Sequence, residues 1–485
     1  MKSINVIAKY RLETINLVVG AVVLTFELAA SRIVAPYIGT TIYVWTSIIG
    51  MILAALAIGY ALGGYIADKR HRMEDVIVML LGASLLLIAT NFIKDAVLAA
   101  IGGSQSDLRW QAFWASFILF APPTIILGAI SPYLVRLDIK DVAHSGRKVA
   151  SISAAGTAGA LLGTFLTGYV LFGFVGTSHI LGYLAVALAL TSFLVRSPNL
   201  LSVRILFLVA AVFWAAVPPG TDIEGLKAEI DTRYNRVIVR DSQWAGRPVR
   251  ILQMDKQAWQ SGVYKDGDEL VFDYTRSFAA AARLSPADGK FLMIGGGAYT
   301  FPEYLGRTYA DARIDVVELD AELLGISREY FDIRLPGNVH VFQADGREFI
   351  NHNQERYDTV FVEVFSSLTP PFQLFTSQTA DRLKESLRPG GMVVINIISA
   401  LSGPDARFAS AVENTYKEHF RNVGVYKVVP EAGDGARQNL TLIASDSGLP
   451  DGLHDGRSAF PRTSVKDRSD LVLRDDFAPV ERLVH

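Results

Sequence analysis

Long apolar runs, separated by short polar segments, fill the first 218 positions of the chain. Because a helix needs roughly 20 apolar residues to cross the hydrocarbon core of a bilayer, these runs predict a bundle of transmembrane helices. We expect seven spans, with six as the alternative, because the last run is short and ends at Pro218-Pro219-Gly220. The expected spans are residues 12–33, 42–67, 76–98, 111–136, 149–172, 176–195 and 202–218.

The pattern changes after Ile230, where short apolar runs alternate with amphipathic segments. Strand patterns at 236–240 and 249–254 predict a small β region, and the segment 275–284 is typical of a helix. Further strand patterns separated by helices predict a doubly wound parallel sheet, an α/β fold of the Rossmann-like kind. These later patterns cover residues 290–294, 313–320, 339–346, 357–364 and 392–397.

Four regions follow from these patterns. We expect a transmembrane helical bundle at 1–220 and a small β region at 221–275. A nucleoside-binding α/β domain is expected at 276–445, followed by a linker and C-terminal tail at 446–485. The stretch 445–470 is rich in Asp, Gly, Ser, Arg and Pro, which is typical of a mobile linker.

Composition supports the division. Only 19% of residues are charged and 51% are hydrophobic, whereas a soluble chain usually carries about 25% charge. The net charge of −2 offers no electrostatic argument for a nucleic-acid partner. There are no cysteines, and the eight histidines show no metal-binding spacing, so we expect no metal site.

Basic residues indicate how the bundle is oriented. Lys and Arg gather before the first span and in alternate loops after it, which predicts a cytoplasmic N-terminus in a multi-pass protein of the plasma (inner) membrane. We expect the first span to be retained rather than cleaved as a signal peptide. Seven spans would place the second half of the chain outside and six would place it inside, and both alternatives stay open.

Small residues recur at four-residue spacing on two of the predicted spans. Gly59, Gly63 and Ala67 share a face, and Gly156, Ala160 and Thr164 share another. Such faces let helix backbones approach closely. We expect packing within one bundle rather than a dimer interface.

The first predicted span contains an acidic residue, Glu27, with Arg32 five positions later. Ionisable groups inside a membrane are costly and are often functional. Two interpretations stay open, a site for a cation or amine at Glu27 and a structural pair in which Arg32 reaches the membrane interface.

Polar residues stand where the buried strands end. The glycine turn Gly295–Gly297 would let the backbone approach a ligand closely. Glu318 lies 21 residues beyond Gly297, a spacing suited to the ribose hydroxyls of a nucleoside, and Asp345 could accept from an adenine amine. Glu363 faces the position of the reacting atom. The alternative is a scaffold in which these acids merely cap helices.

Several segments together resemble the spermidine synthase family. They are Leu292–Gly297, Val317–Asp320, Ala344–Gly346, Tyr357–Val360, the Arg233–Val237 region, and the bundle segments Glu27–Tyr37 and Tyr43–Trp45, which resemble membrane-fused members. The resemblance implies a polyamine aminopropyltransferase with a methyltransferase-like fold. In addition, Gly64–Arg70 partly resembles a loop signature of major facilitator transporters.

The resemblance also implies roles for individual residues. Glu363 would be the catalytic base that helps to deprotonate the attacking amine. Ser366 stands at the position that would contact the amine substrate. Independently of the resemblance, Tyr264 is a candidate for the lining of the acceptor pocket, with a core or rim aromatic as the alternative. The co-substrate, decarboxylated S-adenosylmethionine or S-adenosylmethionine, would be bound by Gln260, Tyr274, Gly295, Gly296, Gly297, Glu318, Asp320, Asp345 and Gly346.

The chain also departs from the family pattern. Ala298 and Tyr299 follow the glycine turn where the family has Asp and Gly, and Ser366 stands where a second Asp binds the polyamine. The catalytic position itself holds Glu363 rather than Asp. These changes remove two carboxylates that would attract a cationic amine, so the identity of the acceptor stays open.

Three functions therefore compete. The leading hypothesis is a membrane-anchored aminopropyltransferase that releases 5′-methylthioadenosine. A transporter or sensor whose second half binds a nucleoside or polyamine without turnover is the alternative, and a methyltransferase is the third. The expected partners are the lipid bilayer and a small amine, with a homo-oligomer expected by analogy with the family alone.

Overall fold

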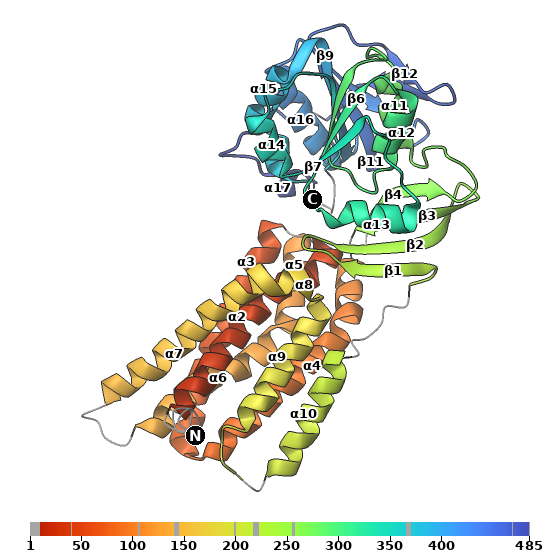
Figure 1. Cartoon of the computed structure of the whole chain (residues 1–485). Coiled ribbons are helices and arrows are strands. Elements are labelled where there is room, and N and C mark those ends of the chain that lie inside the picture. The colour runs from red at the N-terminus through yellow and green to blue at the C-terminus, as the bar shows by residue number, and fades with distance from the viewer. Residues whose placement is uncertain are drawn as a thin grey trace. The chain divides into compact units, whose positions relative to one another are not determined.

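The structure is a computed structural model of the whole chain (Figure 1). It describes residues 10–39, 41–104, 107–139, 145–197, 200–216, 223–254, 258–364, 370–467 and 469–484. The chain divides into two compact units, Met1–Asp222 and Ile223–His485.

The first unit consists of helices joined by short connections in its described residues, as the apolar runs predict. Each of the seven predicted segments lies mostly on helix, but residues 176 and 193–195 fall outside α9, and residues 217 and 218 lie outside the described residues. The helices are α2 (Arg11–Ile38), α3 (Ile42–Lys69), α4 (Met73–Gly102), α5 (Leu108–Leu119), α6 (Ala121–Asp138), α7 (Ser145–Leu166), the π-helical turn η2 (Thr167–Leu171), α8 (Phe172–Phe174), α9 (Thr177–Ser192) and α10 (Leu201–Ala216).

The number of helices long enough to cross a membrane is smaller than the sequence predicts. Among the described residues, four helices are long and apolar enough: α2, α3, α4 and the continuous α7–α8 segment. The pair α5 and α6, bent by 53°, would be a fifth span if it crosses as one. Helices α9 and α10 have 16 residues each, about 24 Å at the α-helical rise and less than the roughly 30 Å hydrocarbon core. The structure thus supports four to five spans.

Glycines bring the helices of the bundle together in two tight pairs. A Cβ on Gly20 of α2 would lie 2.0 Å from the backbone oxygen of Gly156 on α7, so only glycine allows this approach. A Cβ on Gly59 or Gly63 of α3 would lie 2.3 Å or 2.2 Å from backbone oxygens of α6. The predicted small-residue faces therefore pack within the bundle, as expected.

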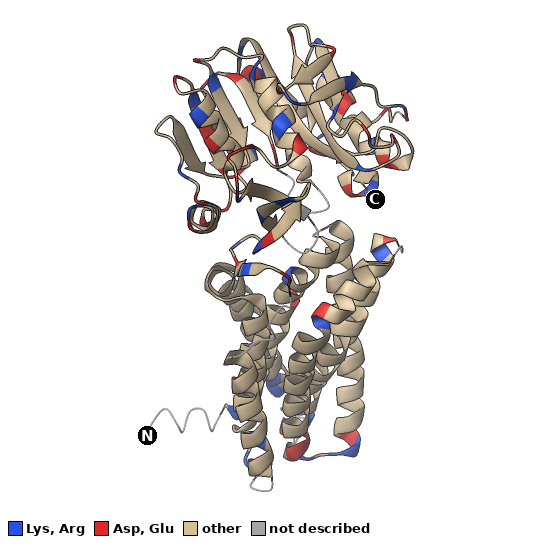
Figure 2. Cartoon of the chain, turned by 90° about the vertical axis from the view of Figure 1, so that its right-hand side faces the viewer, with Lys and Arg blue, Asp and Glu red and all other residues tan. Residues whose placement is uncertain are grey.

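Large apolar side chains cover the outside of the bundle. Leu161, Leu162 and Phe165 on α7 are exposed, as are Leu206 and Val209 on α10. Charged residues are sparse along the helices and gather toward their ends, whereas in the second unit they occur on helices, strands and loops alike (Figure 2). Such a surface is suited to lipid and indicates membrane insertion.

The second unit begins with a four-stranded antiparallel sheet of order β1-β2-β3-β4. Its strands are β1 (Leu226–Asp231), β2 (Arg236–Trp244), β3 (Arg247–Met254) and β4 (Ala258–Tyr264). Ala245 and Gly246 link β2 to β3 with φ values of 50° and 76°, the left-handed backbone of a two-residue hairpin. The predicted small β region is this sheet.

A nine-stranded sheet forms the rest of the unit, in the order β12-β13-β10-β11-β9-β8-β5-β6-β7. Strands β7, β6, β5, β8 and β9 are parallel, and the others are antiparallel. The strands are β5 (Lys290–Ile294), β6 (Arg313–Glu318), β7 (Val339–Gln343), β8 (Tyr357–Val362), β9 (Leu387–Ser399), β10 (Asn422–Lys427), β11 (Gln438–Ser445), β12 (Gly452–His454) and β13 (Ala459–Thr463).

Helices cover both faces of this sheet and bury a separate apolar core on each. Phe361 of β8 joins the core against α11, α12 and α13, while Val360 and Val362 join the core against α14, α15, α16 and α17. The helices are α11 (Asp273–Ala282), α12 (Thr300–Thr308), α13 (Glu322–Phe331), α14 (Gly346–His352), α15 (Ser377–Glu385), α16 (Arg407–Lys417) and α17 (Val480–Val484), with the 3₁₀ turns η4 (Phe372–Leu374) and η5 (Pro404–Ala406).

The predicted linker at 446–485 is wrong in its first part. Residues 452–454 and 459–463 form β12 and β13, and Leu453 and Phe460 are buried. The polar composition of this stretch concealed two short strands whose apolar side chains complete a sheet edge. The tail is also packed, because Leu473 and Val480 belong to the core.

Strand order reverses between β5 and β8, since the chain runs outward from β5 through β6 and β7 before it returns to β8. Open parallel sheets bind ligands at the carboxyl ends of the strands beside such a switch point. The residues that follow β5, β6, β7 and β8 are therefore the candidate site.

Candidate functional site

The glycine turn after β5 fits against β8 so closely that no side chain is tolerated. Gly295 has a φ of 93°, and a Cβ there would lie 1.8 Å from the backbone oxygen of Glu363. Gly297 has a φ of 53°, and its Cβ would lie 2.7 Å from the Ser261 hydroxyl. Tyr299 begins α12 in the left-handed region with a φ of 57° and is buried. The turn is thus fixed between β8 and the small sheet.

Glu318, at the end of β6, holds this turn through its carboxylate. Its Oε2 accepts from the Gly296 amide at 2.7 Å, and its Oε1 accepts from the Asp320 amide at 2.9 Å. The Gly297 amide lies close enough to help to lower the pKa of the Glu318 carboxyl. Burial raises the pKa of the Glu318 carboxyl, and these amide hydrogen bonds oppose the rise. A carboxylate has about four acceptor positions, so acceptor capacity remains for a ligand hydroxyl.

Asp345 ends β7 and caps α14. Its Oδ1 accepts from the amides of Arg347 at 2.8 Å and Glu348 at 3.0 Å. Within the described part of the chain, Oδ2 accepts no hydrogen bond and can receive one from a ligand. A Cβ at Gly346 would lie 2.7 Å from a methyl carbon of Ile294, so this glycine lets α14 approach β5. Asp345 therefore caps α14 with one carboxylate oxygen, and its other oxygen remains available to a ligand. The arrangement is compatible with both interpretations of this acid.

Glu363 follows β8 and is 6% exposed. The Gln260 side-chain amide on β4 donates to its two carboxylate oxygens at 3.4 and 3.5 Å. Burial raises the pKa of Glu363 to about 8, the charge of Glu318 adds to the rise, and hydrogen bonds from Gln260 and Asn396 oppose it. A carboxyl of this kind exchanges a proton near neutral pH, as a general base must.

Asn396 is a site residue that the sequence analysis did not identify. It lies on β9 beside Glu363, because Val362 pairs with Ile395 in parallel register. Asn396 is 2% exposed, and its side-chain oxygen accepts from the Asn439 amide of β11 at 2.9 Å. This bond leaves the amide nitrogen of Asn396 to face Glu363. A polar residue at the end of the fifth predicted strand was the available signal.

Tyr274, on α11, supports Gln260 from behind. Its hydroxyl donates to the Gln260 backbone oxygen at 2.8 Å. Burial and the nearby charge of Glu363 raise the pKa of Tyr274 well above its ordinary value, so it remains a donor. Ser261 accepts from the Ala298 amide at 3.1 Å. Strand β4 and the glycine turn are thereby joined.

The remaining predicted residues lie elsewhere or outside the described chain. Asp320 is 2% exposed and accepts from the Thr232 hydroxyl and, at 3.2 Å, from the Glu322 amide. It anchors the β1–β2 turn, so its predicted contact with a ligand is not favoured by this arrangement. Tyr264 lies under the Arg247 guanidinium, 3.8 Å from its ring centre. Ser366 lies outside the described residues.

Together, these residues place a buried, titratable carboxyl beside a glycine turn and two further strand-end acids. The site carries the carboxyl groups of Glu318 and Glu363, and the hydrogen bonds described to them come from amide groups rather than from cations, so it favours a positively charged ligand. No group of three or more His, Asp or Glu side chains suited to a metal occurs in the part of the chain that the structure describes.

Comparison with known proteins agrees with this geometry. Residues 273–436 match the model of the spermine/spermidine synthase domain. A probable polyamine aminopropyl transferase of Bifidobacterium longum is 27% identical over 249 residues, 46% of this chain and 55% of that protein. A putrescine N-methyltransferase 2 of Nicotiana attenuata is 34% identical over 191 residues, 38% of this chain and 48% of that protein.

Two further similarities extend the comparison. A polyamine aminopropyltransferase of Corynebacterium efficiens is 25% identical over 355 residues. The match covers 66% of this chain, more than the second unit alone can supply, and 67% of that protein. The crystal structure of a probable spermidine synthase from Corynebacterium glutamicum is 26% identical, with a TM-score of 0.41, and covers 47% of this chain and 82% of that one.

The chain spans about half the length of most of the curated relatives that it matches. The matched domain contains the glycine turn, the three strand-end acids and Asn396, while Gln260 lies just before it. The protein therefore carries a domain of the spermidine synthase, or polyamine aminopropyltransferase, family joined to an N-terminal apolar helical region.

Proposed function

We propose that the protein is a membrane-anchored aminopropyltransferase. Its substrates are decarboxylated S-adenosylmethionine, or S-adenosylmethionine itself, and an amine acceptor, and it releases 5′-methylthioadenosine. The observation that carries the proposal is Glu363, a buried carboxyl whose pKa is raised to about 8 at the switch point of the sheet.

Glu363 acts as the general base. The acceptor nitrogen attacks the carbon next to the sulfonium, a C–N bond forms, and the C–S bond breaks with its electron pair left on sulfur. The proton lost by the amine passes to the Glu363 carboxylate. Gln260 and Asn396 donate to that carboxylate and keep it in place. Positioning supplies much of the rest, because a sulfonium is already a good leaving group.

Glu318 and Asp345 bind the nucleoside. Glu318 keeps acceptor capacity for a ribose hydroxyl after its hydrogen bonds from the Gly296 and Asp320 amides. Asp345 offers Oδ2 to the exocyclic amine of adenine. The three glycines of the turn, Gly295–Gly297, bring the backbone to the same place without side chains.

The acceptor differs from putrescine in our proposal. Ala298, which is fully buried, replaces the family carboxylate after the glycine turn, and Ser366 replaces a second one. Fewer carboxylates mean weaker attraction for a dication, so an acceptor with a single amine near the reacting centre suits the site better.

A second candidate is N-methylation of an amine. Ala298 favours it, because the aminopropyl ammonium loses the counter-charge that would select the decarboxylated substrate. Proteins named putrescine N-methyltransferase are 33–34% identical to this chain over 191 residues. This reaction would transfer the methyl group and release S-adenosylhomocysteine.

The number of membrane crossings, which decides the side on which the second unit lies, is part of the same proposal. We propose a cytoplasmic N-terminus with either seven crossings, of which α9 and α10 would be the two shortest, or six. S-adenosylmethionine is made in the cytoplasm, so supply of the substrate favours six crossings and a cytoplasmic second unit. A topology reporter fused after Val484 separates the two arrangements, since it is active on one side alone. Association into a homo-oligomer is proposed as in the soluble enzymes of the family.

Product analysis tests the function. Full-length protein purified in detergent is incubated with either form of the nucleoside substrate, with and without amines, and the nucleosides are separated by chromatography. 5′-Methylthioadenosine that disappears in the Glu363→Gln variant supports aminopropyl transfer. S-adenosylhomocysteine supports methylation instead. Nucleoside binding without either product would make the second unit a sensor or a partner of a transporter.

A further inference from the structure

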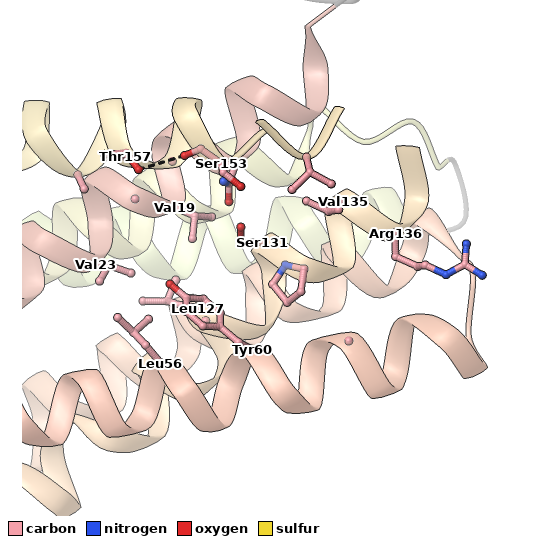
Figure 3. A pocket seen from close by; sticks show the side chains of 18 of the residues that line it. Val19, Val23, Leu56, Tyr60, Leu127, Ser131, Val135, Arg136, Ser153 and Thr157 are labelled. Atoms are coloured by element: carbon pink, nitrogen blue, oxygen red, sulfur yellow. Dashed lines mark hydrogen bonds between the residues drawn. The ribbon is translucent and has the colours of Figure 1, made fainter. Parts of the chain in front are cut away.

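A cavity lies inside the helical bundle, between its two glycine-packed helix pairs. Its volume is about 660 Å³, within the range of small-molecule sites. Residues of α2, α3, α6 and α7 line it, and Figure 3 shows their labelled side chains around one space. The cavity belongs entirely to the first unit.

The walls of this cavity are amphipathic. Val19, Val23 and Leu56 supply apolar surface, while Tyr60, Ser131 and Ser153 supply hydroxyl groups. Asn16 also lines it and donates to the Ile152 backbone oxygen at 2.8 Å. A ligand with an aliphatic chain and hydrogen-bonding groups matches such walls better than a lipid tail alone, since unpaired hydroxyls against hydrocarbon are costly.

One end of the cavity carries an ion pair with no net charge. Asp68 of α3 and Arg136 of α6 line it and form an ion pair at 2.9 Å. Both side chains are exposed, at 71% and 47%, and Arg136 extends away from the cavity in Figure 3. This end therefore opens to water and adds no net charge.

Glu27 lies beyond the other end. Asn16, Gly20, Val23 and Leu24 of α2 line the cavity, and Glu27 continues that row by one turn. The Cα–Cβ bonds of a helix tilt toward its N-terminus, so Glu27 projects from α2 toward the turn that holds Leu24, at the edge of the lining residues rather than among them. The row from Asn16 to Glu27 extends over about 16 Å at the α-helical rise.

The Glu27 carboxylate is available for a ligand. Throughout the described residues it makes no hydrogen bond and no ion pair, and it is half-buried near the middle of a transmembrane helix. Arg32, the alternative partner, instead places its guanidinium 4.0 Å from the ring centre of Phe172 and donates to the Phe172 backbone oxygen at 3.5 Å. The predicted structural pair of Glu27 and Arg32 is therefore absent from the described part of the bundle.

The segment that continues α7 departs from regular α-helical geometry at the level of Glu27. Helix α7 runs parallel to α2, with Gly159 against Leu17, Gly163 against Ala21 and Thr167 bonded to Thr25 at 2.9 Å. The same offset places Glu27 level with the π-helical turn η2. Such turns are frequent at functional sites in helices.

We propose that this cavity binds a linear aliphatic ammonium ion, with Glu27 as its counter-charge and the apolar walls against its methylene chain. The cavity itself does not depend on the transferase activity. The choice of a polyamine as the probe does rest on the proposed function, because an amine of this class would be its substrate or product.

The absence of cysteine from the chain provides a direct test. The Ser153→Cys variant puts a single thiol in the cavity wall, and a cationic methanethiosulfonate reagent measures its reactivity in full-length protein. Ala154→Cys, at an exposed neighbouring position outside the cavity, is the matched control. Spermidine at ten times its dissociation constant fills about nine-tenths of the sites and should slow modification of the first thiol about tenfold. The second thiol should react at an unchanged rate.

Glu27→Gln is then added to the Ser153→Cys variant. Protection by spermidine should weaken at least about tenfold in concentration, because a buried charge pair is lost. Glu13→Gln, on the same helix outside the cavity, should leave protection intact. Equal protection with and without Glu27, equal protection by an uncharged diol, or no protection at all would overturn the inference. None of these results depends on turnover in the second unit, so the two proposals fail separately.

Discussion

The side-chain amide of Gln260 donates to both carboxylate oxygens of Glu363, at 3.4 and 3.5 Å, across 103 positions of sequence. One residue belongs to the small antiparallel sheet and the other to the end of a central parallel strand. The small sheet thus contributes directly to the environment of the proposed base.

The first prediction concerns pH. Burial raises the pKa of Glu363 to about 8, and the base is active only when it is deprotonated. The rate constant kcat/KM should therefore rise with pH between about 7 and 9 and level off above the pKa. A pH–rate profile of the full-length enzyme measures this, and a profile that is flat from pH 6 to 9 would contradict the role of Glu363.

The same shift has a consequence for stability. The folded state keeps Glu363 protonated up to about pH 8, whereas the unfolded carboxyl loses its proton near its ordinary value of 4.5. Between these values the folded state binds more protons, so stability falls as pH rises. Thermal unfolding of wild type compared with Glu363→Gln should show this loss in wild type alone. A parallel dependence in both proteins would argue that Glu363 is not the group responsible.

Asn396 is predicted to tune the base. The hydrogen bond from Asn396 lowers the pKa of Glu363, and its loss in Asn396→Ala should move the pH–rate profile upward by about one pH unit, the worth of one charged hydrogen bond. Asn439→Ala should produce a smaller shift, because it only frees the Asn396 amide to turn. Asn422→Ala, on β10 at the surface, is the control and should leave the profile in place.

Gly295 is predicted to tolerate no substitution. Alanine there would put a Cβ 1.8 Å from the Glu363 backbone oxygen at a φ of 93°, which should destabilise the second unit by more than about 3 kcal/mol. Gly325, exposed on α13 with no atom within 4 Å of its Cβ position, is the control. Gly325→Ala should stabilise by about 0.5–1 kcal/mol. Equal thermal stability of the two variants would contradict the packing described for the turn.

The sequence predicts the parallel sheet and its strand-end acids well, because both follow from local pattern. Each buried strand is a short apolar run, and the residue after it necessarily reaches the same edge of the sheet. The positions of Glu318, Asp345 and Glu363 follow from that rule. Their hydrogen bonds do not follow from that rule, because the fold of the glycine turn decides which amides donate to Glu318.

Long-range contacts explain what the sequence leaves out. Asn396 acquires its role from Asn439 on an antiparallel strand, a pairing between residues 43 positions apart. The spacing of Asp320 predicts a ligand-binding acid. In the structure, however, the hydroxyl of Thr232, 88 positions earlier in the sequence, donates a hydrogen bond to its carboxylate. Helices α9 and α10 are apolar enough to predict spans yet too short to settle the count. In each case the hydrogen-bond partner, or the position at which the helix ends, depends on residues outside the short stretch of sequence on which the prediction rests.

The measurement that tests the central claim most directly is the release of 5′-methylthioadenosine by wild-type protein and by Glu363→Gln, at pH 8 with decarboxylated S-adenosylmethionine and a panel of amines. The account predicts an amine-dependent product in wild type and at least a 100-fold lower rate in the variant, the scale of a lost general base. Nucleoside binding should persist in both proteins. Release at equal rates, or binding with no product under any amine, would contradict the assignment of Glu363 as the base of an aminopropyltransferase.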